Sequence, residues 1–193
     1  MLTIAWDVDD ILNDLMRSWL GDKWLLEHPD CRVSFKQITE NTPERIIKGT
    51  LAEYRLSLDS FRLSGAYARL EPNPEILAWF RESGDKARHI ALTAVPVKAA
   101  HISADWVLKN FGKWIRTFHF IPSLRMDDAA PEYDQNKADY LKWLNKVDVL
   151  VEDSEDNIRQ AKELGVKGVL IARPWNKSNL SVKEALTELN KLL

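Results

Sequence analysis

Short apolar runs separated by amphipathic segments are the feature that most constrains the fold of this chain. Five runs rich in β-branched or aromatic residues have the length of buried strands, at residues 2–6, 89–93, 117–121, 147–151 and 168–171. Amphipathic helical patterns follow most of them, at residues 74–83, 97–110, 137–144, 156–164 and 182–192. This alternation predicts an α/β fold, a doubly wound parallel sheet with helices on both faces.

One stretch, from about residue 15 to 70, departs from the alternation. It contains no comparable strand but several helix-like segments, including residues 15–27 and 43–56. Pro72 and Pro74 favour extended backbone and mark the return to the sheet. At 193 residues the chain has the length of one domain with a modest insertion. We therefore expect a helical cap at residues 15–72, inserted into a catalytic core of residues 1–14 and 73–193.

Charge and composition exclude several classes of protein. A net charge of −2 gives no general attraction to nucleic acid polymers or anionic membranes. The single cysteine, Cys31, excludes an intramolecular disulfide. The first residues lack the basic region of a signal peptide, and no run approaches the roughly 18 apolar residues of a membrane span. We expect a cytoplasmic protein that acts on a small molecule, with an oligomeric state that the sequence does not set.

Polar residues stand where three of the predicted strands end. Asp7 and Asp9 follow the first strand, Thr93 ends the second, and Glu152 with Asp153 follows the fourth. Open parallel sheets bind ligands at this edge, so these side chains should converge there. Four converging carboxylates repel one another unless a cation lies between them. Oxygen ligands in an open site suit Mg²⁺ better than a closed Ca²⁺ cage, so we predict a Mg²⁺ site.

The same residues carry a family resemblance. Ile4-Ala5-Trp6-Asp7-Val8-Asp9-Asp10 resembles the first signature of haloacid dehalogenase-like phosphatases, an apolar strand that ends in Asp-x-Asp. Leu92-Thr93 resembles the second signature, Lys137 can serve as the third, and Val149-Leu150-Val151-Glu152-Asp153-Ser154 is similar to the acidic fourth. The match covers nearly the whole chain, and its helical insertion resembles the C1-type cap of that family.

The resemblance implies a role for each of these residues. Asp7 would be the nucleophile that forms an aspartyl-phosphate, and Asp9 the general acid and base. The Mg²⁺ ligands would be Asp7, the backbone carbonyl of Asp9, Glu152 and Asp153. Thr93 and Lys137 would contact the phosphoryl oxygens. Lys142 and Lys146 are alternatives to Lys137. We prefer Lys137 because residues 134–136 indicate a helix start, which leaves Lys137 near the edge of the sheet where the acids lie.

The substrate class rests on weaker signals. The run Arg173-Pro174-Trp175-Asn176 follows the fifth strand, and a similar run occurs in bacterial relatives of the 5'(3')-deoxyribonucleotidases. This favours a nucleoside monophosphate, whose base would meet the aromatic residues Trp175, Tyr54 and Phe61 at the rim of the site. Glu152-Asp153-Ser154 also resembles β-phosphoglucomutase-like members, so a sugar phosphatase or phosphomutase stays open. A non-catalytic binding or regulatory domain is the alternative from another class.

Overall fold

The fold is built on a parallel sheet. The computed structural model describes residues 1–125, 131 and 133–193. Its strands are β1 (Thr3–Trp6), β2 (Arg88–Val95), β3 (Ile115–Pro122), β4 (Val149–Glu152) and β5 (Lys167–Leu170). They pair in parallel in the order β3-β2-β1-β4-β5. The chain moves outward from β1 to β3 and then returns to the other side of β1, which confirms the predicted doubly wound α/β sheet.

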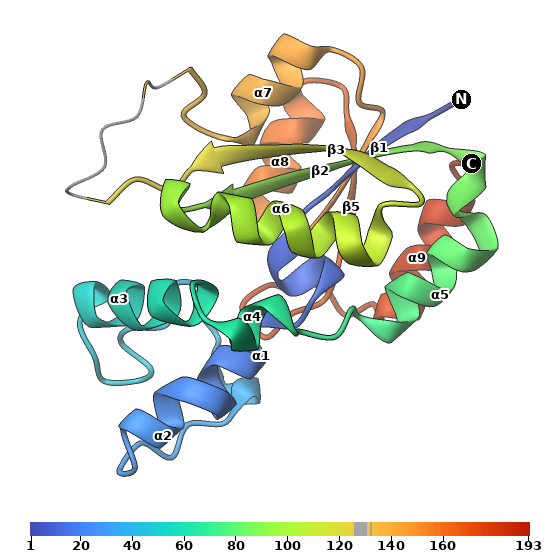
Figure 1. Ribbon diagram of the computed structural model, residues 1–193. Coiled ribbons are helices and arrows are strands. Elements are labelled where there is room, and N and C mark those ends of the chain that lie inside the picture. The colour runs from blue at the N-terminus through green and yellow to red at the C-terminus, as the bar shows by residue number, and fades with distance from the viewer. Residues whose placement is uncertain (126–130, 132) are drawn as a thin grey trace.

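Helices cover both faces of this sheet (Figure 1). The helices are α5 (Pro74–Ser83), α6 (Val97–Phe111), α7 (Lys137–Leu144), α8 (Glu155–Glu163) and α9 (Val182–Asn190), and a short turn, η4 (Gly84–Lys86), follows α5. Ile4 and Trp6 of β1 pack with α5, α6 and α9 in one hydrophobic cluster. Ala5 points the other way and packs with α7 and α8 in a second cluster. The alternation of side chains along β1 therefore supplies both cores of the sheet.

Local capping explains why two helices begin where the sequence predicts. The side chain of Asn73 accepts hydrogen bonds from the backbone amides of Glu75 and Ile76, and Pro74 occupies the first helical position of α5. Asn136 caps α7 in the same way through the amide of Asp139, at 3.0 Å. No helix in the described ranges is both long and apolar enough to cross a membrane.

The segment between β1 and α5 forms a group of short helices, here called the helical module. After the turn η1 (Val8–Leu12) come α1 (Leu15–Trp19), η2 (Leu20–Trp24), α2 (Leu25–Glu27), η3 (Phe35–Gln37), α3 (Leu51–Arg62) and α4 (Gly65–Ala68). These elements share a hydrophobic cluster of their own, which includes Trp19, Trp24, Tyr54 and Phe61. Figure 1 shows the module gathered below the sheet and its covering helices. That it moves as a cap, with the boundaries given above, stays a prediction.

One predicted helix of the module has different bounds. The pattern at residues 43–56 indicated a helix, whereas the structure begins α3 at Leu51 and continues it to Arg62. The reason is a capping box, in which the side chain of Thr50 accepts from the amide of Glu53 and the Glu53 carboxylate accepts from the amide of Thr50. The Thr-x-x-Glu spacing was present in the sequence and could have located this start.

Candidate active site

The register of the sheet brings the predicted residues to one edge. Trp6 lies opposite Ala91 of β2 and Val151 of β4. The next residue, Asp7, donates its backbone N–H to the carbonyl of Val151 at 3.0 Å. Asp7 and Glu152 therefore lie at the same level, at the carboxyl ends of β1 and β4. Thr93 lies near the carboxyl end of the neighbouring strand β2. All the acids predicted from the strand ends lie at the carboxyl edge of the sheet.

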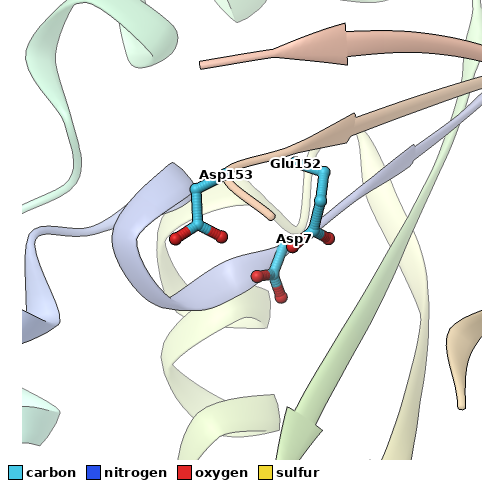
Figure 2. A group of neighbouring side chains, drawn as sticks. All are labelled: Asp7, Glu152 and Asp153. Carbon is cyan, nitrogen blue, oxygen red and sulfur yellow. The ribbon is translucent and has the colours of Figure 1, made fainter. Parts of the chain in front are cut away.

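Three carboxylates form a compact buried cluster (Figure 2). One oxygen each from Asp7, Glu152 and Asp153 lies within 4.8 Å of the others. Burial and the nearby Glu152 carboxylate raise the pKa of Asp7 to about 7. Burial and the charges of Asp7 and Asp10 raise the pKa of Asp153 to about 7. A hard divalent cation would relieve this repulsion, so the donor set fits Mg²⁺. The carbonyl of Asp9 as a further ligand stays a prediction.

Lys137 lies against two members of this cluster. Its Nζ is 2.8 Å from Asp7 Oδ1 and 2.6 Å from Glu152 Oε2. Burial opposes the charge of Lys137, but the two carboxylates raise its pKa above the ordinary value. Lys142 and Lys146, the alternatives, are exposed and line a different cavity of about 720 Å³ with Met1 and Asp148. The structure therefore places Lys137 at the acids, while its contact with phosphate stays a prediction.

A cavity of about 300 Å³ lies between this edge and the helical module. Its lining includes the predicted residues Asp7, Asp9, Thr93, Lys137, Glu152 and Asp153. Of the three aromatic residues predicted for substrate contact, Tyr54 lines this cavity. Phe61 belongs instead to the hydrophobic cluster of the module, and Trp175 packs against that cluster. Tyr54 is therefore the one of these three aromatic residues that lines the cavity.

Trp175 and Asn176 both donate hydrogen bonds to Asp153. The indole Nε1 of Trp175 donates to Asp153 Oδ2 at 2.6 Å, and its ring meets Phe35 edge-on. The side chain amide of Asn176 donates to the backbone carbonyl of Asp153 at 2.8 Å. The run after the fifth strand therefore lies against Asp153 and contacts its carboxylate through Trp175. Stacking of Trp175 on a substrate stays a prediction.

Asp9 is bound by side chains that the sequence did not point to. Arg62 donates to Asp9 Oδ2 from Nε at 3.2 Å and from Nη2 at 2.9 Å. The hydroxyl of Tyr67 donates to Oδ1 at 2.9 Å, and the amide of Asn13 to the same oxygen at 3.3 Å. Arg62 and Tyr67 belong to the helical module, 53 and 58 residues away along the chain. Asp9 is therefore where the module meets the predicted catalytic residues.

Asp10 accounts for the turn that follows the first strand. Its φ of 63° lies in the left-handed region, which Asp tolerates better than most residues. Its carboxylate accepts from the amide of Met16 at 2.9 Å, and burial raises its pKa to about 7. Asp at this position therefore allows the backbone to turn directly after Asp9.

Comparisons with known proteins address the fold. No family model matches the chain, and no curated protein matches it. Among solved structures, a haloacid dehalogenase-like hydrolase from Streptococcus pneumoniae is similar, with a TM-score of 0.65, 13% identity, and coverage of 100% of this chain and 99% of that one. A predicted phosphatase from Clostridium acetobutylicum matches with a TM-score of 0.62 and 14% identity, covering 99% and 97%. A proposed β-phosphoglucomutase from Thermotoga maritima matches with a TM-score of 0.57 and 17% identity, covering 100% of both chains. The protein has the haloacid dehalogenase-like fold.

Proposed function

We propose that the protein is a Mg²⁺-dependent hydrolase of small phosphate monoesters that acts through an aspartyl-phosphate on Asp7. The observation that carries the proposal is the buried cluster of Asp7, Glu152 and Asp153, with Lys137 beside it, on the wall of a cavity. A cluster with this repulsion is costly unless it binds a cation. Fold alone would not support an activity, since one fold hosts many functions.

The roles of the side chains follow from their places in the cavity. Asp7, Glu152 and Asp153 would hold the ion, and bound Mg²⁺ would shield the phosphate charge from an incoming carboxylate. Lys137 fixes the position of Asp7 through the contact at 2.8 Å. An Asp7 oxygen attacks phosphorus, and Asp9 gives a proton to the departing alkoxide. Asp9 then takes a proton from the water that cleaves the aspartyl-phosphate, which releases inorganic phosphate and restores Asp7.

Two substrate classes are supported by different observations. The nucleoside monophosphate prediction is supported by Tyr54, an aromatic side chain that lines the cavity. A sugar phosphate or another hydroxylated phosphate is supported by the polar lining on the side of the module, where Asn41, Thr42 and Arg55 lie. A volume of about 300 Å³ is at the low end of the range for small-molecule sites, so either substrate has to be small.

The other readings conflict with the composition of the cluster. A purely non-catalytic domain has no need of a buried group of acids at the strand ends. A dehalogenase has no need of a metal-binding cluster beside its nucleophile. We therefore propose a phosphatase first, with a phosphomutase as the alternative within the same chemistry.

Asp7 provides the decisive test. Purified protein should hydrolyse p-nitrophenyl phosphate with Mg²⁺ and lose this activity in EDTA. Asp7→Asn should abolish turnover and leave no phosphoenzyme, while Asp9→Asn should keep the nucleophile and lose about 10² to 10⁴ in rate. A panel of phosphorylated metabolites then separates the substrate classes, and added sugar phosphate acceptors distinguish a mutase. Full activity of Asp7→Asn would refute the mechanism.

A further inference from the structure

The two walls of the cavity differ in charge. The sheet side carries the carboxylates of Asp7, Glu152 and Asp153, with Lys137 between two of them. The module side is formed in part by α3, which contributes Tyr54, Arg55, Leu58 and Arg62. Positions 54, 55, 58 and 62 fall on one face of a helix, so α3 presents a continuous surface to the cavity. This surface contains two guanidinium groups.

The two arginines of α3 differ in what they bind. Arg62 donates two hydrogen bonds to Asp9, so its charge is matched by a carboxylate. Arg55 is exposed and lines the same cavity. Within the described parts of the chain, no side chain forms an ion pair or hydrogen bond with Arg55. Glu44 is a nearby acid, but it does not line the cavity. Its pKa is lowered mainly by a hydrogen bond from Thr42 and to a smaller extent by the charges of Arg45 and Arg55.

The acid best placed on α3 to pair with Arg55 is Asp59, and Asp59 binds other cations. Asp59 stands four residues further along α3, the spacing at which opposite charges pair on a helix. Arg125, from the segment after β3, takes both oxygens of Asp59 at 2.8 Å each, and Lys98 lies 3.6 Å away. Asp59 is buried under these contacts. The packing of the module on the sheet therefore leaves Arg55 as a cation that faces the cavity.

We propose that Arg55 recognises a second anionic group of the substrate, a carboxylate or a second phosphate, at the end remote from the phosphate that is transferred. This inference rests on the proposed function, because it takes the carboxylate cluster as the place of the transferred phosphate. Asn41 and Thr42 line the same cavity and supply polar groups for hydroxyls of the substrate. The substrate class is then phosphorylated hydroxy acids or sugar bisphosphates. A guanidinium suits both groups because it binds their oxygens in pairs.

The test compares substrates that differ in the remote group alone. 3-Phosphoglycerate and glycerol 3-phosphate share a carbon skeleton and differ in a carboxylate against a hydroxymethyl group. Glucose 1,6-bisphosphate and glucose 6-phosphate form the corresponding pair for a second phosphate. The wild-type protein should favour the member with the second anion in at least one pair by about tenfold in kcat/KM at low ionic strength. The pair that shows the preference identifies the group.

Variants assign the preference to Arg55. Arg55→Gln should bring the ratio of kcat/KM within the pair close to one, and Arg55→Lys should keep part of it. Arg45→Gln is the matched control, because Arg45 is an exposed arginine of the same module that does not line the cavity. Its ratio should equal that of the wild type. No preference in either pair, or an unchanged ratio in Arg55→Gln, would overturn the inference while phosphatase activity stands.

A binding measurement separates this inference from the proposed function. If the protein hydrolyses no phosphate monoester, p-nitrophenyl phosphate included, the proposed function fails. Calorimetric titration of wild-type and Arg55→Gln protein with the same pairs, in the presence of Mg²⁺, then decides the role of Arg55. An anion preference that Arg55→Gln removes supports the inference, and equal affinities within both pairs refute it.

Discussion

Asp59 is expected to be the residue through which the helical module is held most strongly to the sheet. Its side chain is 3% exposed, and Arg125 donates to its two oxygens at 2.8 Å each. Lys98 and Arg62 add charges at 3.6 and 3.7 Å. Asp59→Asn keeps the shape of the side chain but leaves these cations without their shared anion. Removing one partner of a buried ion pair typically costs about 3 to 5 kcal/mol.

The partial exposure of Arg125 sets the expectation at the lower end of this range. Its side chain is 17% exposed, so water compensates part of the loss. We expect Asp59→Asn to lower the free energy of unfolding by about 3 kcal/mol, which corresponds to a drop in Tm of about 6 to 12 °C for a chain of this length. Urea denaturation followed by circular dichroism measures the first quantity, and a thermal melt the second.

The control uses an ion pair that water surrounds. Asp85 and Lys113 lie 3.8 Å apart with side chains 79% and 65% exposed, so Asp85→Asn should change stability by less than about 0.5 kcal/mol. A double-mutant cycle of Asp59→Asn with Arg125→Gln should give a coupling energy above about 1 kcal/mol. Additive effects of the two substitutions, or a loss below about 1 kcal/mol in Asp59→Asn, would refute the assignment.

The remaining predictions concern the cluster of Asp7, Glu152 and Asp153. Asp153→Asn should abolish calorimetric binding of Mg²⁺, whereas Asp156→Asn, at an exposed acid in the first turn of α8, should leave it unchanged. Trp175→Phe should weaken Mg²⁺ binding by about tenfold because it removes the N–H that orients Asp153, and an unchanged affinity would contradict this. The pKa of Asp7 and Asp153 is raised from 3.8 to about 7, so ionising them is less favourable in the folded state. The metal-free protein should therefore lose stability as pH rises from about 4 through 7, and Mg²⁺ should raise the Tm more at pH 8 than at pH 5; melts that show the opposite trend would contradict it.

Local patterns explain why much of the fold could be predicted from the sequence. Most of the strands are short apolar runs bounded by polar residues. The helices α5 and α7 are capped by Asn73 and Asn136, the residues that precede them. The acids of the site could be predicted because each stands at the end of a strand or within three residues after it. A parallel sheet then brings them together without further information.

Contacts across the chain explain what could not be predicted. Arg62 and Arg55 are both arginines in one amphipathic pattern, and nothing in that pattern shows that Arg62 reaches Asp9 while Arg55 faces the cavity. The difference depends on how α3 lies over the sheet, which is set by packing of the module as a whole. The pairing of Arg125 with Asp59, 66 residues apart, has the same origin.

Asp9 shows how the helical module takes part in the proposed chemistry. Its oxygens accept hydrogen bonds from Arg62, Tyr67 and Asn13. In the proposed reaction Asp9 carries a proton for the leaving group, and that O–H requires an acceptor, whereas the guanidinium of Arg62 can offer donors alone. The proton is therefore expected on Oδ1, where the hydroxyl of Tyr67 can turn to accept it while Arg62 stays on Oδ2. Arg62 and Asp59 lie on one helix, and Asp59 is bound to Arg125, so the place of Arg62 at Asp9 depends on how α3 is held to the rest of the protein. A substrate that binds Arg55 as proposed would contact the same helix, and Arg55, Arg62 and Asp9 line one cavity, so we expect Arg62→Lys to impair proton transfer by Asp9 more than it impairs substrate binding.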